Sequence, residues 1–189
     1  MKKQLMKIAF AAFATGLVLT SCKKDKDETE TNDEEVITTM KLTFVPVGGG
    51  TTLTYQFEDA DGPGGLAPVQ QDIVLAPSKT YNVSVQLLNV TANPVDDITT
   101  EIEEEKDAHR FYYIPAAGSN ITVSNLDNDS NGVPVGLTST WTTTAAATGS
   151  IRVVLRHYPG NPPGKAAADA VDSPKSGTDI EVNFVTRVQ

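Results

Sequence analysis

The sequence predicts an all-β protein, a single antiparallel β-sandwich of the immunoglobulin-like or jelly-roll-like kind with about eight or nine strands. Thr and Val recur throughout the chain after its first twenty residues, and their branched side chains favour strands. Several segments alternate apolar and polar residues with a period of two, as half-buried strands do. Most connections are too short for helical crossovers, which favours antiparallel pairing.

The strand candidates follow one another between residues 36 and 189, and turn residues separate them. The clearest is 81–87, where Tyr, Val, Val and Leu alternate with Asn, Ser and Gln. The alternation of Ile98, Thr100 and Ile102 predicts a strand that runs into three glutamates. The other candidates are 40–44, 53–57, 72–75, 111–114, 121–123, 151–155 and 180–186.

One connection, 159–177, is long, contains four prolines and has no strand pattern. Loops of this length are usually either functional or mobile, and we expect a mobile one.

The composition excludes several classes of protein. Of 189 residues, 39% are hydrophobic, which is enough for a core and too much for a wholly disordered chain. The formal net charge is -9, and no cluster of Lys and Arg appears in the mature domain, so nucleic acid is not an expected partner.

The start of the chain is typical of a bacterial lipoprotein signal peptide, residues 1–21. A short basic segment with three lysines precedes an apolar run of about a dozen residues, 8–19, which is too short to span a bilayer. The run ends in Leu19-Thr20-Ser21-Cys22, which resembles the lipobox. That resemblance implies that the Cys22 thiol accepts a diacylglycerol and that further acylation, palmitate included, anchors the chain in a membrane.

Residues 22–35 form an acidic segment without apolar residues, so we expect a flexible tether between the lipid and a domain at 36–189. An acidic segment directly after the cysteine resembles the signal that sends some Gram-negative lipoproteins to the outer face of the outer membrane; a plain spacer is the alternative. We therefore expect a location in the cell envelope, lipid-anchored in the outer membrane and either periplasmic or surface-exposed.

The sequence does not point to an enzyme. Cys22 is the only cysteine and is assigned to lipidation, no Ser lies in a G-x-S-x-G context, and no Gly-rich phosphate loop precedes a helix. A single cysteine also leaves no intrachain disulfide.

A metal site is the sharpest functional hypothesis. His109 and His157 are the only histidines, and each lies at the edge of a predicted strand. By alternation both point inward near one end of the sandwich. Two imidazoles and one carboxylate suit zinc, copper or a similar cation, whereas partly buried histidines at the rim of the sandwich are the simpler interpretation. The candidate carboxylates are Glu103, Glu104, Glu105 and Asp107.

A weaker hypothesis is a calcium loop at 127–132. Asp127, Asp129 and Asn131 place oxygen ligands at alternate positions before a glycine, as calcium loops do. The twelfth position of such a loop is Thr138 rather than an acidic residue, and a hairpin or Asx turn explains the same residues. Nearby, Trp141 and the Thr-rich segment 138–144 suggest either a carbohydrate platform or, as is commoner for a lone Trp, part of the core.

Three segments, 103–113, 127–137 and 149–157, together resemble a group of small cell-envelope lipoproteins of Gram-negative bacteria. Some of these carry the label "type 1 periplasmic binding fold superfamily". That fold is α/β, whereas the period-two pattern here predicts strands. The resemblance implies no established activity, but it suggests work beside an outer-membrane receptor.

These observations lead us to expect a non-catalytic, membrane-anchored binding lipoprotein that captures a metal ion or small ligand for uptake. The alternative is a structural or adhesive surface lipoprotein with the acidic segment as its stalk.

The lipidation hypothesis predicts that Cys22→Ala abolishes palmitate incorporation and releases the protein from the membrane fraction, because no other thiol is present to accept the lipid. Radiolabelled palmitate and membrane fractionation measure both effects. Ser21→Ala keeps a small residue before the cysteine and should leave both unchanged; label retained by Cys22→Ala would contradict the hypothesis.

Overall fold

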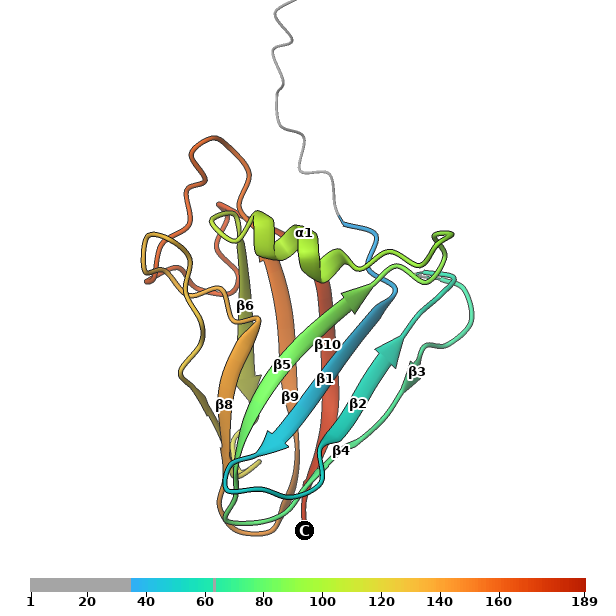
Figure 1. Cartoon of the computed structure of the whole chain (residues 1–189), viewed down its shortest axis with the longest axis vertical. Helices are drawn as coiled ribbons and strands as arrows, with labels where there is room; N and C mark the ends of the chain where they lie inside the picture. Colours follow the sequence, from blue (N-terminus) through green and yellow to red (C-terminus); the bar gives the residue numbers. More distant parts are fainter. Residues whose placement is uncertain (1–34, 63) are drawn as a thin grey trace, which may run out of the picture.

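The computed structural model describes residues 35–62 and 64–189, which form two packed β-sheets (Figure 1). The first has six strands in the order β3-β2-β1-β5-β8-β7, and the second has four in the order β4-β10-β9-β6. The predicted all-β sandwich is therefore confirmed, with ten strands. Their bounds are β1 Thr39–Pro46, β2 Leu53–Glu58, β3 Val69–Gln70, β4 Ile73–Leu75, β5 Thr80–Leu88, β6 His109–Pro115, β7 Ile121–Ser124, β8 Thr138–Thr143, β9 Ala147–His157 and β10 Gly177–Val188.

The signal peptide at 1–21, Cys22 and the tether up to residue 34 lie outside the described residues. Among the residues that are described, no helix has both the length and the apolar character needed to cross a membrane.

The core lies between the sheets and is built from the inward positions of the alternating strands. On β5 the burial alternates along the strand, and Tyr81, Val83, Val85 and Leu87 are the buried residues. Phe44 of β1 packs edge-to-face on Trp141 of β8, with ring centroids 5.1 Å apart. Trp141 is fully buried, so it belongs to the core and not to a carbohydrate platform. Aromatic pairs of this geometry stabilise the folded protein by more than the burial of their surface alone accounts for.

The strand expected at 98–102 is wrong, because Ile98–Glu104 forms the helix α1. The Asp97 side chain accepts a hydrogen bond from the Thr99 amide and caps the first turn. Ile98 and Ile102 are the buried residues of this helix, and their spacing of four places them on one helical face. The same two residues also fit a period of two, so the pattern did not distinguish helix from strand.

Two further details differ from the expectation. β4 pairs with β10 in parallel, so the sandwich is not purely antiparallel. β8 is a strand within the Thr-rich segment 138–144, which was not among the strand candidates. Its inward residues Ser139, Trp141 and Thr143 are buried, whereas Thr138, Thr140 and Thr142 face outward.

Antiparallel pairing brings several strand ends together at one end of the sandwich. β6 begins opposite the end of β9, since His109 pairs with His157, and β10 begins beside the same residue. β1 begins beside the end of β5, from which the chain continues to α1. Figure 1 shows α1 lying across this end, above the strands. Polar residues at five strand ends are thus neighbours in space.

Candidate functional site

The two histidines meet at this end of the sandwich. His109 and His157 are cross-strand partners on β6 and β9, and their rings stack with centroids 4.6 Å apart and planes 21° apart. The strand-edge placement predicted from alternation is therefore observed. His109 is fully buried, whereas His157 is partly exposed.

The hydrogen bonding of His109 selects one tautomer. Its Nδ1 lies 3.1 Å from the backbone oxygen of Glu105, which can only accept a hydrogen bond, so Nδ1 carries the proton. Nε2 then presents a lone pair, is buried, and has no hydrogen-bond partner among the described residues. Burial, followed by the charges of His157 and Lys165, lowers the pKa of His109 to about 4, although the Glu105 carbonyl opposes the shift. At neutral pH this ring is neutral, which is the form that binds metals.

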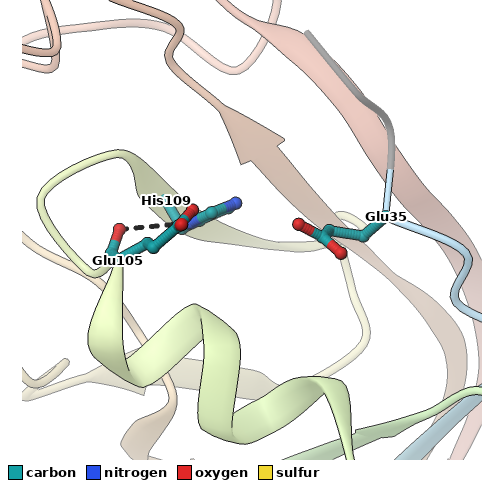
Figure 2. A group of neighbouring side chains, drawn as sticks. All are labelled: Glu35, Glu105 and His109. Atoms are coloured by element: carbon teal, nitrogen blue, oxygen red, sulfur yellow. Dashed lines mark hydrogen bonds between the residues drawn. The ribbon is translucent and has the colours of Figure 1, made fainter. Parts of the chain in front are cut away.

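Two carboxylates accompany this ring. Glu35, Glu105 and His109 each offer one ligand atom within 4.8 Å of the others, and in Figure 2 the carboxylate of Glu35 points toward the far end of the His109 ring. The two glutamates come from different segments, since Glu35 precedes β1 and Glu105 is the C-cap of α1. A fourth polar group, Oδ2 of the buried Asp179 on β10, lies 3.9 Å from Nε2 of His109.

Negative charge accumulates at this site. The pKa of Glu35 is raised to about 7, first by burial and then by the negative charges of Glu101, Glu105 and Asp96, with a hydrogen bond to Glu101 contributing. Bringing like charges together in a partly desolvated place costs free energy that a proton or a cation can relieve.

The arrangement has the features of a cation site. A metal-binding histidine usually donates its other ring N–H to a carbonyl or carboxylate, as His109 does to Glu105. Ligands around one tetrahedral zinc ion lie about 3.4 Å apart, whereas the ligand atoms of this group lie within 4.8 Å of one another, so they must approach each other by up to about 1.4 Å to hold the ion.

The structure brings together only part of the predicted ligand set. Glu105 and His109 belong to the group of three, and His157 contacts it through the stacked ring. Glu103 is exposed on α1, and Asp107 accepts hydrogen bonds from the Ser130 hydroxyl at 3.1 Å; neither belongs to the group. Glu35 was missed, because the sequence places it as the last residue of an apparently solvated tether, and no local pattern marks it.

In the predicted calcium loop, the carboxylates of Asp127 and Asp129 are bound by other groups of the protein. Oδ1 of Asp129 accepts hydrogen bonds from the Asn131 and Val133 amides at 2.8 and 2.9 Å, which is the geometry of an Asx turn. Oδ2 of Asp129 pairs with the Lys165 ammonium at 2.8 Å, and both side chains are at most 2% exposed. Asp127 accepts from the Thr138 amide at 2.7 Å. The Lys165 ammonium therefore lies against the carboxylate that would bind calcium.

Lys165 belongs to the long connection 159–177, which contacts the domain at several points. Its ammonium also donates to the backbone oxygen of His109 at 3.0 Å. Arg110 donates to the Ala166 oxygen at 2.9 Å, and Arg156 donates to the Ser173 oxygen at 3.1 Å. These bonds hold the connection against the start of β6 and the end of β9, next to the candidate site.

No family model matches this chain, and neither the curated proteins nor the solved structures include a significant match. The resemblance to small Gram-negative lipoproteins therefore stays an expectation from the sequence.

The buried pair predicts an asymmetry between two lysines of one connection. Lys165→Met should lower the free energy of unfolding by about 3–5 kcal/mol, because it leaves the Asp129 carboxylate buried without its cation. Lys175 pairs with Asp169, but the Lys175 side chain is 51% exposed. Lys175→Met should therefore lower the free energy of unfolding by at most about 1 kcal/mol. Urea denaturation measures both; equal losses would contradict the assignment.

The charge of Glu35 predicts a pH-dependent effect in metal-free protein. Because the folded-state pKa lies near 7 and the unfolded one near 4.5, folding takes up a proton between these values and stability falls as the pH rises through them. Glu35→Gln cannot lose a proton, so it should be more stable than the native chain at pH 8 and equal to it at pH 4. Solvent screening limits the gain to about 1 kcal/mol or less.

Urea midpoints measured at both pH values in EDTA test this. Glu103→Gln, which changes an exposed glutamate of α1 and keeps Glu35, should follow the native chain at both pH values. A Glu35→Gln variant that is less stable at pH 8 would show that the carboxylate is favourably paired.

Proposed function

We propose that this protein is a lipid-anchored, non-catalytic lipoprotein of the cell envelope that binds a divalent transition-metal ion at the end of its sandwich and holds it for uptake. The anchor is supported by the signal peptide and lipobox-like segment that end at Cys22. The ligand is supported by the group of Glu35, Glu105 and His109. A receptor in the outer membrane is the partner that such a role requires.

The observation that carries this proposal is the state of His109. A buried imidazole nitrogen without a hydrogen bond costs free energy, and folded proteins rarely leave one. The His109 ring belongs to a group with the carboxylates of Glu35 and Glu105, and its Nε2 lies 3.9 Å from a third carboxylate, on Asp179. A bound cation would satisfy the lone pair and relieve the repulsion among the carboxylates together.

The donor set also favours certain ions. One imidazole with two or three carboxylates suits zinc and its divalent neighbours, copper(II) included, better than copper(I), which prefers sulfur. Calcium takes six to eight oxygen ligands, more than this group offers. Since the pKa of His109 is about 4, no proton has to leave this ring when a metal binds at neutral pH.

The proposal predicts that zinc raises the thermal unfolding temperature of the protein purified in detergent, and that His109→Ala and Glu105→Gln weaken zinc binding at least tenfold. Glu103→Gln removes an exposed carboxylate of the same helix and should bind zinc normally. His157→Ala should have a smaller effect than His109→Ala, because His157 stacks against the site without belonging to the group of three.

Thermal shift and calorimetric titration with zinc, copper, nickel and calcium measure these effects. No shift with any ion would overturn metal capture and leave the structural or adhesive role. A zinc effect that survives both His109→Ala and Glu105→Gln would place the ion elsewhere.

A further inference from the structure

The outer face of the six-stranded sheet has an unusual chemical composition. On β5 the outward positions are Thr80, Asn82, Ser84 and Gln86, and they lie beside the outward threonines of β8. The outward residues of β7 continue the pattern, with Thr122 next to Thr142 and Ser124 next to Thr140. Three adjacent strands thus present hydroxyl and amide groups and no charged or aromatic side chain.

The opposite face of the sandwich shows that this neutrality is not a property of the whole surface. Ion pairs lie on and beside the outer face of the four-stranded sheet, Arg152 with Glu181 at 3.5 Å and Arg187 with Asp72 at 2.7 Å. The chain is 21% charged and strongly acidic, so a run of strands without a carboxylate is a local feature.

The neutral face is hollowed at its centre. A groove of about 300 Å³ lies over β5 and β8 and reaches the exposed Val45 of β1, so its lining is mixed and not purely polar. The lining residues are Val45, Asn82, Val83, Ser84, Asn125, Thr138, Ser139 and Thr140. Asn125 stands at the rim with a positive φ of 49°, and its amide donates to the Thr140 hydroxyl at 3.4 Å. The volume is at the lower end of the range for small-molecule sites.

We propose that this groove binds a segment of an uncharged polysaccharide. Hydroxyl and amide groups donate and accept hydrogen bonds, which matches a ligand covered with hydroxyls, and such a ligand brings no charge that the face would have to neutralise. An extended peptide pairs its backbone with a free strand edge, whereas this groove lies across strands whose backbones already pair with each other. Because Trp141 is turned into the core, binding rests on hydrogen bonds and not on stacking.

This site is separate from the proposed metal site, because it lies on the face of β5 and β8 and not at the end of the sandwich. Its test is therefore independent of zinc. The full chain in detergent is run in native gels that contain dextran, xylan, glucomannan or laminarin, and in one that contains the anionic polysaccharide alginate. Retardation relative to a gel without polysaccharide gives the affinity.

A double variant, Asn82→Ala with Thr138→Ala, removes an amide and a hydroxyl from the groove. The matched control, Asn183→Ala with Thr148→Ala, removes the same groups from exposed positions of β10 and β9 in the other sheet. We expect at least one neutral polysaccharide to retard the native chain and the control equally, and the groove variant to bind it about tenfold more weakly.

Three outcomes would overturn the proposal: no retardation by any neutral polysaccharide, retardation by alginate alone, or equal retardation of the groove and control variants. Urea midpoints of the two double variants, measured in parallel, establish that both are folded, so a loss of binding is assigned to the groove.

Discussion

The structure depends on the burial of one apolar layer between two sheets that no disulfide holds together. Cys22 is the only cysteine, so the sheets are joined by side-chain packing, in which Phe44 and Trp141 form the aromatic centre. This constraint requires strict alternation along β5, β8 and β10, since a shift of one residue would turn every apolar side chain to solvent. The outward positions are not constrained by this packing. They hold hydroxyl and amide side chains on β5, β7 and β8, and ion pairs on and beside the outer face of the four-stranded sheet.

The ends of the sandwich are under a different constraint. The apolar layer stops there, but α1 and the connection 159–177 cover one end. Polar groups at that end are therefore shielded from water although they are not part of the apolar core. The protein satisfies some of them internally. Lys165 neutralises Asp129 within a turn that resembles a calcium loop, and two backbone amides complete the carboxylate's hydrogen bonds. Burial pushes the Asp129 pKa upward, but these partners together hold it below its ordinary value.

At the neighbouring site the same desolvation has a different consequence. His109 is held neutral by its burial, and its orientation is fixed by the Glu105 carbonyl. Glu35 and Glu105 bring negative charge to it, while the nearby Lys165 ammonium is paired with Asp129. The contrast between the two clusters is the physical basis for distinguishing a structural pair from a candidate binding site. One cluster contains its own cation, and the other has the donors for one.

The sequence by itself determined the fold class, because period-two burial is a local property that each strand shows independently. It also placed His109 and His157 on inward positions at strand ends, and the two rings do stack. It could not assign 98–102, because Ile98 and Ile102 satisfy both periods and only the Asp97 cap and the packing of α1 against β5 select the helix.

Only the tertiary structure decided which charged residues meet. Glu35 lies 70 residues before Glu105, and Lys165 lies 36 residues after Asp129. Strand order and loop paths set these encounters, and no periodicity records them. An acidic residue has the same local signature whether it remains in solvent, pairs with a buried lysine or faces a histidine, because the difference lies in what the rest of the chain places beside it.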